Sequence, residues 1–502
     1  MSLATIYSRA RAGINAPLVT VETHLSNGLP SLTIVGLPEA AVKESKDRVR
    51  SALINSNFEF PTRRITINLA PADLPKEGGR FDLPIAMGIL AASGQIPEHV
   101  LHEYEFLGEL ALSGEIKAVQ GILPASIAAS ERHRKVIVPL SNANEAALAT
   151  NSQVIAPTHL LELCAHLNQT QLIEPHILQV NETTSASEHK DFADVIGQPL
   201  AKRAIEIAAA GKHNLLMVGP PGTGKTMLAS RLPSILPALT QPEKLEAIAI
   251  ASIANQSFCI HSKQPTFRNP HHTASSVALV GGGSNPKPGE ISLAHNGVLF
   301  LDELAEFDRK VLEVLREPLE AGQIVISRAQ HQVTYPANFQ FITAMNPCPC
   351  GYHGDAKTLC TCSPDQVRRY RQKISGPLLD RIDIQIAVSR LPIKELVTNK
   401  QSNETSSHIK PRVEKARKLQ QKRQGKTNSA LSSREMENHC ALGNQEQDEI
   451  TAIMDKLNLS GRAYHRILKV SRTIADLSGS KHIERPHMME AIGYRRLDKL
   501  FS

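Results

Sequence analysis

The chain has 502 residues, more than one hydrophobic core usually serves, so we expect roughly two to four domains. The first residues contain no continuous apolar core of signal-peptide length, and no stretch elsewhere reaches the roughly 18 apolar residues of a membrane span, which predicts a soluble, cytoplasmic protein with no membrane partner. The net charge of +7 hides a basic region, since residues 363–426 hold 16 Lys and Arg against 6 Asp and Glu. That region suits a polyanion such as nucleic acid, although a solvated helix face explains the charge equally well.

Two polar segments, residues 181–190 and 398–407, lack hydrophobic periodicity and are predicted to be linkers. Before the first, strand-like and helical runs are mixed, which predicts a separate α/β domain. Between them, short apolar runs predict buried parallel strands, and after the second the pattern is helical. The predicted division is an N-terminal domain over residues 1–180, a linker over 181–190, a core over 191–390 and C-terminal helices over 391–502.

A phosphate-binding loop is the strongest motif in the core. Residues 219–226 read GPPGTGKT and match G-x-x-x-x-G-K-[ST] at every fixed position, between an apolar run and a helical one. Glycines let backbone amides surround phosphate oxygens, Lys225 is suited to reach the β- and γ-phosphates of ATP, and Thr226 to bind Mg²⁺. The predicted nucleotide contacts are Gly219, Pro220, Pro221, Gly222, Thr223, Gly224, Lys225 and Thr226.

Two adjacent carboxylates follow the next apolar run, VLFL at residues 298–301. Asp302 is suited to hold magnesium-bound water, and Glu303 to polarise the water that attacks the γ-phosphate. Adjacent acids at a strand end are often only a helix cap. Their position about eighty residues after the phosphate loop favours a hydrolytic site.

Two further polar residues extend this prediction. The apolar run at residues 339–344 leads to Asn346, whose side chain is placed to orient the same water. Arg381 falls at a predicted helix end, where a local salt bridge with Asp380 or Asp383 is the plain interpretation.

The chain has seven cysteines, and four of them form two C-x-C pairs that are separated by nine residues. In a reducing compartment four thiols at this spacing suit tetrahedral zinc, and redox-active or incidental thiols are the alternative. Because cysteine fills every position, the metal would be structural. We therefore interpret residues 346–364 as a zinc-knuckle-like insertion with ligands Cys348, Cys350, Cys360 and Cys362.

Together these residues resemble the magnesium-chelatase-like AAA+ ATPases, and most closely the bacterial ComM (YifB) family, which is associated with natural transformation. The resemblance covers nearly the whole chain and includes further motifs in family order, namely residues 194–198 (DVIGQ), 268–273 (RNPHHT), 326–329 (ISRA), 375–383 and 472–477 (RTIADL). It implies an α/β fold with an AAA+ P-loop core and a C-terminal helical lid.

The resemblance also implies roles for individual residues. Asn346 looks like the sensor 1 residue, Arg381 like the arginine finger, and Arg462 like the sensor 2 arginine of the lid. Val195 and Ile196 would pack near the adenine. An arginine finger acts on a neighbouring copy, so the family form is a homo-oligomeric ring, usually a hexamer.

Two insertions in the core are candidates for DNA contact. Residues 323–328 and 331–335 alternate like two strands of a hairpin, which in related helicases faces the pore, so Arg328 and His331 are candidate phosphate contacts. A purely structural hairpin is the alternative. The other insertion carries three glycines and Lys287, which suit a mobile pore loop, and its adjacent His271 and His272 are expected to form hydrogen bonds within the insertion.

The N-terminal domain resembles the Lon protease fold at residues 114–122 and 136–139. Lon cleaves peptides with a serine and a lysine. Here the segment in place of the serine loop, KEGGRF at residues 76–81, has no serine, and the segment after Gly121 has no lysine. We expect a non-proteolytic scaffold or DNA-binding module.

The resemblance therefore predicts an ATP- and Mg²⁺-dependent DNA motor, a helicase or branch-migration factor in recombination during natural transformation, which acts on single-stranded or branched DNA. The alternative is an AAA+ ATPase that remodels a protein partner, as in magnesium-chelatase-type metal insertion. Residues 476–480 match the D-x-S-x-S of a metal-dependent adhesion site, but only 22 residues follow, too few for the domain that such a site needs.

Overall fold

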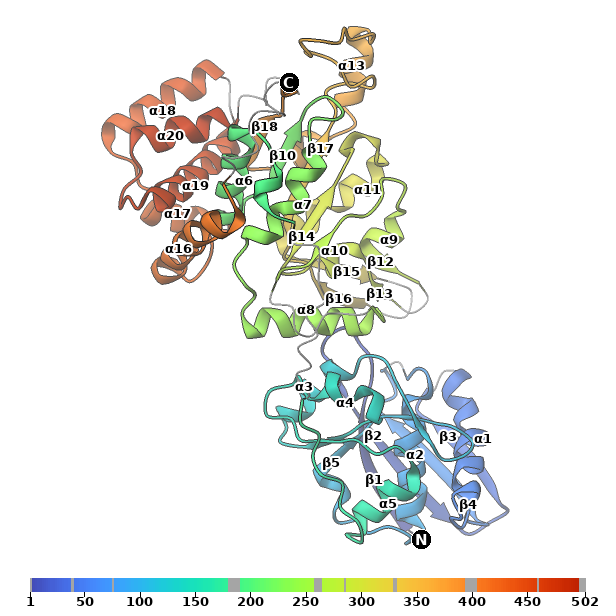
Figure 1. The fold of residues 1–502 in the computed structure, drawn as a ribbon. Helices are drawn as coiled ribbons and strands as arrows, with labels where there is room; N and C mark the ends of the chain where they lie inside the picture. Colours follow the sequence, from blue (N-terminus) through green and yellow to red (C-terminus); the bar gives the residue numbers. More distant parts are fainter. Residues whose placement is uncertain are drawn as a thin grey trace. The chain divides into compact units, whose positions relative to one another are not determined.

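The computed structural model describes residues 2–37, 40–74, 76–178, 190–256, 264–283, 286–327, 332–392, 404–457 and 460–495. The chain divides into two compact units, of which the first contains Met1–Thr183 and Leu245–His261, and the second Thr184–Lys244 and Ser262–Ser502 (Figure 1). Residues 245–261 were expected in the core, so the first unit is larger than the sequence predicts.

The first unit is built on a seven-stranded mixed sheet with the order β3-β4-β2-β1-β5-β8-β9. Antiparallel pairs join β1 to β2 and β2 to β4, and the other neighbours are parallel. Its strands are β1 (Ser2–Arg9), β2 (Leu18–Ser26), β3 (Ser31–Val35), β4 (Arg64–Ala70), β5 (Tyr104–Phe106), β8 (Lys135–Ile137) and β9 (Val154–Ile155), with β6 (Glu109–Leu110) and β7 (Ile116–Lys117) as a separate pair.

Helices of the first unit are α1 (Ala40–Asn55), α2 (Asp82–Ala92), α3 (Ile122–Ser130), α4 (Ala143–Ala146) and α5 (Leu160–Leu167). Every residue of α2 is buried, as expected for an apolar helix within a core. Helix α8 (Gln241–Ile253) begins in the second unit, and its Ile248 and Ala249 pack with Leu123 and Leu148 of the first. This apolar contact explains why residues far along the chain cluster with the N-terminal unit.

The second unit contains a parallel five-stranded sheet with the order β11-β14-β17-β10-β18. Its strands are β11 (Phe267–Arg268), β14 (Val298–Leu301), β17 (Gln340–Met345), β10 (Leu215–Val218) and β18 (Ile384–Ala387). All residues of β10, β14 and β17 are buried, which confirms the three parallel strands predicted from short apolar runs.

The helices of this part of the chain are α6 (Pro199–Gly211), α7 (Lys225–Ile235), α9 (Ser276–Val280), α10 (Glu290–Leu293), α11 (Arg309–Val314), α12 (Arg316–Ala321), α13 (Pro364–Arg371) and α14 (Gly376–Leu379). Two short antiparallel hairpins also belong to it. They are β12 (Gly281–Gly282) with β13 (Lys287–Pro288), and β15 (Gln323–Ser327) with β16 (Gln332–Pro336).

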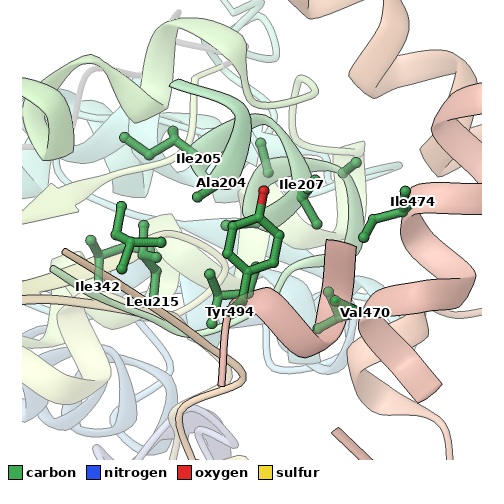
Figure 2. Packing of buried hydrophobic residues seen from close by; sticks show 14 of the residues in the cluster. Ala204, Ile205, Ile207, Leu215, Ile342, Val470, Ile474 and Tyr494 are labelled. Carbon is green, nitrogen blue, oxygen red and sulfur yellow. The ribbon is translucent and has the colours of Figure 1, made fainter. Parts of the chain in front are cut away.

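The C-terminal part is helical, as expected, with α16 (Ser406–Gln424), α17 (Ser433–His439), α18 (Asn444–Leu457), α19 (Gly461–Ser478) and α20 (Arg485–Gly493). Figure 2 shows Val470, Ile474 and Tyr494 packed with apolar side chains of α6, in one core with the sheet residues Leu215 and Ile342. No described helix is long and apolar enough to cross a membrane.

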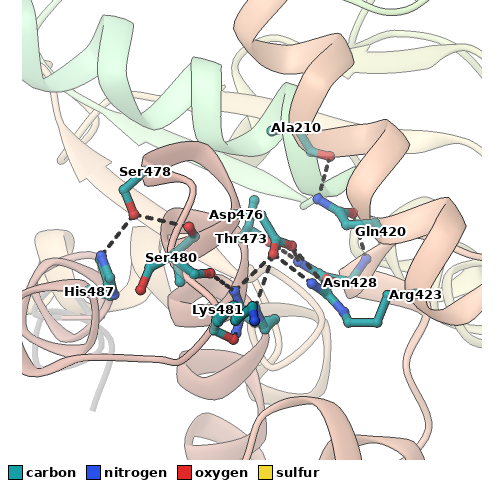
Figure 3. Close-up of polar contacts among 12 residues, drawn as sticks. Ala210, Gln420, Arg423, Asn428, Thr473, Asp476, Ser478, Ser480, Lys481 and His487 are labelled. Carbon is teal, nitrogen blue, oxygen red and sulfur yellow. Dashed lines mark hydrogen bonds and ion pairs between the residues drawn. The ribbon is translucent and has the colours of Figure 1, made fainter.

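Buried polar contacts join the same elements. His213 lies between Asp383 and Thr473, with Nδ1 3.2 Å from the carboxylate and Nε2 2.7 Å from the hydroxyl. Asp476, from the adhesion-like motif, is buried, accepts hydrogen bonds from Arg423 and Asn428 (Figure 3), and pairs with Arg472. Its carboxylate therefore links α16 to α19.

Candidate functional site

The predicted nucleotide residues meet at the carboxyl ends of three neighbouring strands. Because β10 and β17 pair with Val218 opposite Met345, and β14 pairs with β17, the segments that follow these strands leave the sheet at one edge. The phosphate loop follows β10, the two acids follow β14, and Asn346 follows β17. Ligands bind at this edge in open α/β sheets.

The loop backbone has the shape that the motif requires. Gly224 has a φ of 85°, in the left-handed region that favours glycine, and α7 begins at the next residue. A Cβ on Gly219 would lie 2.2 Å from the carbonyl oxygen of Val388, so only glycine fits beside the end of β18. The loop thus leads directly into the start of α7, and backbone amides at such a helix start are the groups that bind phosphate.

Lys225 and Thr226 already contact the other predicted residues. Lys225 Nζ donates to the carbonyl of Gly219 at 2.7 Å and lies 3.3 Å from Asn346 Oδ1. Thr226 Oγ1 donates to Asp302 Oδ2 at 2.5 Å. Burial lowers the pKa of Lys225, while the negative charge of Asp302 and Glu303 opposes this shift. A bound phosphate would likewise favour the protonated lysine.

Glu303 has an unusual backbone for a residue with a side chain. Its φ is 51°, and its N–H donates to Asp302 Oδ1 at 2.9 Å. Its carboxylate is half exposed, and Oε2 lies 3.3 Å from His272 Nδ1. We expected His271 and His272 to bond within their insertion, and His271 does contact Thr273 Oγ1 at 2.8 Å, whereas His272 reaches the proposed base. In the sequence, the RNPHHT motif was the only signal for this region, and it did not indicate the contact between His272 and Glu303.

A cavity of about 470 Å³ lies beside the phosphate loop, and we call it the nucleotide cavity. Val195 and Ile196, which the resemblance places near the adenine, line it together with the glycines Gly222 and Gly224. Its other described lining residues are Asp194, Gln198, Thr223, Met227, Leu228, Lys357, Arg390 and Leu391. Sequence reasoning missed Lys357 and Arg390. Within the described lining, no residue comes from the C-terminal helices.

The two predicted arginines lie together in a second place. Arg381 is nearly buried, its guanidinium is paired with Glu320, and its Nε has no hydrogen-bond partner among the residues that the structure describes. Arg462 lies 3.2 Å from Asp380 Oδ2. Both line a cavity of about 250 Å³ that shares no described residue with the nucleotide cavity, and we call it the arginine cavity. The local salt bridge of Arg381 with Asp380 or Asp383 is not observed, since Asp383 pairs with Arg466.

The four cysteines form a compact cluster. The Sγ of Cys348 lies 3.3 Å from that of Cys350 and 3.7 Å from that of Cys360, and all four sulfur atoms lie within 4.8 Å of one another. Tetrahedral zinc with bonds of roughly 2.3 Å needs sulfurs about 3.8 Å apart. Backbone N–H groups donate to Cys348 and Cys362, which stabilises thiolates. The donor set is therefore compatible with one structural zinc ion.

The DNA-contact candidates lie in and beside the two hairpins. The strands predicted for the second hairpin are confirmed as β15 and β16, with Ser327 opposite Gln332, while Arg328 and His331 lie outside the described residues. Lys287 is exposed on β13, which pairs with β12, so the glycine segment forms a short hairpin. The hydroxyl of Tyr335 donates to the carbonyl of Pro286 at 2.7 Å, so the two insertions pack together.

The N-terminal unit has no Ser–Lys pair at the place where a Lon-type dyad is expected. The cavity beside residues 77–80 is lined by Arg11, Glu109 and residues 118–120, and its described lining contains neither serine nor lysine. Lys76 is fully buried, and its ammonium donates to the carbonyls of Gly36 and Pro71. Lys76 therefore holds neighbouring loops in place.

The parallel sheet, the phosphate loop and the two acids at one sheet edge define a P-loop ATPase of the AAA+ type. Family models for magnesium chelatase subunit ChlI match residues 191–396, residues 21–142 (subunit ChlI of Mg-chelatase) and residues 403–495 (the ChlI C-terminal region). The chain belongs to this magnesium-chelatase-like family, which confirms the resemblance seen in the sequence.

Curated relatives extend the match to the whole chain. Competence protein ComM of Haemophilus influenzae is 52% identical over all of this chain and 99% of its own length. The uncharacterized protein YifB of Escherichia coli is 49% identical over all of this chain and 98% of its own. Lon protease 2 of Bacillus subtilis is 24% identical over about a third of each chain.

Proposed function

We propose that this protein is a ring-forming, ATP-dependent DNA motor of the cytoplasm, a helicase or branch-migration factor that acts in recombination during natural transformation. The observation that carries the proposal is the separation of the two cavities. One copy holds the phosphate loop with its acids, and it keeps its predicted finger and sensor 2 arginines elsewhere. A complete hydrolytic site then requires an arginine from a neighbouring copy.

Within the nucleotide site, each predicted residue has a specific task. Thr226 and Asp302 would hold Mg²⁺, which neutralises phosphate charge when bound. Glu303 polarises the attacking water, and Asn346, which lies beside Lys225, orients it. The distorted backbone of Glu303 supports an active-site role, because strained residues persist where the surrounding structure holds them.

Two copies would complete each site through Arg381 and Arg462. The unpaired Nε of Arg381 and the exposed guanidinium of Arg462 supply positive charge that a transferred phosphoryl group needs. Since each copy both donates and receives arginines through different surfaces, the contact is head-to-tail and closes as a ring, for which we propose a hexamer. Helices α16–α20 then act as the C-terminal part that carries Arg462.

Single-stranded or branched DNA is the proposed substrate. The supporting observations are the exposed Lys287, the hydrogen bond from Tyr335 of β16 to the neighbouring Pro286, the basic residues 363–426 and the name of the Haemophilus relative, a competence protein. Arg328 and His331, which lie outside the described residues, complete the set of proposed phosphate contacts. The four-cysteine loop binds structural zinc, and the N-terminal domain is a non-proteolytic scaffold or DNA-binding module with a Lon-type fold.

The deciding experiment measures ATP hydrolysis with single-stranded, duplex and branched DNA across a salt series. A DNA motor shows stimulation that weakens as salt rises, because phosphate contacts release counterions. Lys287→Ala should weaken stimulation without changing the basal rate. If no DNA form stimulates the ATPase, the proposal fails and remodelling of a protein partner becomes the better function.

A further inference from the structure

The loop between the two C-x-C pairs forms one wall of the nucleotide cavity. Lys357 lies in this loop, is exposed, and lines the cavity with Gly222 and Gly224 of the phosphate loop. Its ammonium has no hydrogen-bond or ion-pair partner within the described part of the chain. A cation that lines the same cavity as a phosphate loop is available to a nucleotide phosphate.

The phosphate loop holds this wall from one side. Gly351 has a φ of 85°, and a Cβ at this position would lie 2.8 Å from Cδ of Pro221. The backbone of the cysteine loop therefore lies directly against the phosphate loop. The two segments are in contact at this point, one residue before the cavity-lining Gly222.

The end of β18 holds the wall from the other side. Arg390, which also lines the cavity, donates to Thr358 Oγ1 at 3.3 Å and lies 3.5 Å from Asp355 Oδ2. Its guanidinium carbon lies 5.2 Å from the centre of the Tyr352 ring. One arginine thus contacts three residues of the loop, all within six positions of Lys357.

The cysteine cluster is the remaining element that can order the loop. Residues 346–363 contain no helix or strand, so no regular backbone hydrogen bonding holds this segment. A metal ion on four cysteines closes the loop at both ends and removes much of its conformational freedom. The ordered loop then keeps Lys357 in the cavity.

We propose that Lys357 is a nucleotide-binding residue, which contacts a phosphate of ATP or ADP, and that a metal ion on Cys348, Cys350, Cys360 and Cys362 sets nucleotide affinity by positioning it. This inference rests on the proposed ATP site. It adds a function to the cysteine cluster. The metal ion would be required for tight nucleotide binding although it does not touch the nucleotide.

The first experiment titrates fluorescent ADP into the full chain and its Lys357→Ala variant. A charge-assisted contact is expected to account for a Kd increase of roughly tenfold in the variant. Lys415→Ala is the matched control, because Lys415 is an exposed lysine on α16 that lines neither cavity, and its Kd should not change. An unchanged Kd for Lys357→Ala overturns the inference. Failure of the wild-type chain to bind any nucleotide refutes the proposed function instead.

The second experiment tests the link to the metal. Zinc content is measured before and after chelation, and circular dichroism checks that the stripped chain stays folded. Stripping should raise the Kd of the wild type about as much as Lys357→Ala does, and should add little in that variant, since both changes remove one contact. If zinc removal raises the Kd of Lys357→Ala by the same factor as that of the wild type, the proposed coupling is overturned.

Asp355→Asn provides a test that keeps all four cysteines. Asp355 lies outside the lining of the nucleotide cavity and holds the loop through Arg390 and the N–H of Thr358, which donates to its Oδ2 at 3.1 Å. The variant should keep its zinc and bind ADP several times more weakly. An unaltered Kd with full zinc content would show that the placement of the loop does not govern affinity.

Discussion

The nucleotide cavity and the arginine cavity differ in the charged residues that lie at each. Beside the nucleotide cavity, the adjacent acids Asp302 and Glu303 lie near the phosphate loop, whose buried cation is Lys225. Four Arg and Lys line the arginine cavity against two acids, Glu320 and Asp380. Phosphate binding needs the first arrangement, and stabilisation of a charged transition state needs the second. Their separation within one copy explains why we expect activity only from an oligomer.

Of the variants considered, Arg381→Ala should cause the largest loss of ATPase activity. An arginine that acts on a neighbour's nucleotide is worth roughly a thousandfold in kcat, so we expect a loss of that order with little change in ADP affinity. Arg368→Ala, at an exposed arginine of α13, is the control. An Arg381→Ala protein that hydrolyses ATP normally would remove the arginine cavity from catalysis.

Glu303→Gln should have the next largest effect, a loss of roughly a hundredfold in kcat with ATP binding retained, because the water loses its base. The control is Glu317→Gln, at an exposed glutamate of α12.

A mixture of the Glu303→Gln and Arg381→Ala proteins tests whether the two residues act in different copies. Random rings would contain intact sites at roughly a quarter of their interfaces, so activity should return. No recovery would mean that both residues act within one copy.

Acid should weaken the structure beneath the arginine cavity. Burial opposes ionisation of Asp383, but the charge of Arg466 and the hydrogen bond from His213 hold its pKa well below the ordinary value. Its stabilising effect is therefore present above the unfolded pKa of about 3.9 and is lost as pH falls towards the folded value. We expect a loss of about 1 kcal/mol, measured by denaturant unfolding between pH 6 and pH 3. Asp383→Asn should be less stable at pH 6 and should show a weaker pH dependence.

Arg462→Ala should have the smallest effect. Its guanidinium is 69% exposed and, in the described part of the chain, pairs with Asp380 alone, so water screens its charge more than that of nearly buried Arg381. We expect kcat to fall by roughly threefold to tenfold. Arg434→Ala, at another exposed arginine of the helical part, should leave kcat unchanged. A loss larger than that of Arg381→Ala would reverse the ranking of the two arginines.

Patterns that are contiguous in the sequence predicted much of this structure. The glycine loop, the acids after a buried strand and the paired cysteines each combine residue type with short spacing, and the structure brings together the residues of each set. Lys357 and Arg390 carried no such signal. An exposed lysine in a cysteine loop resembles any surface lysine until the loop is folded against Pro221.

By itself, the sequence determined the elements whose physics is local. Apolar runs specify buried parallel strands, and glycines specify a loop that only they can adopt. Only the tertiary structure decided which distant segments meet. It placed Arg462 beside Asp380 and Arg381, His272 beside Glu303, and residues 245–261 with the N-terminal unit. Such contacts depend on how helices and loops pack, and packing has no period or spacing that a linear sequence displays.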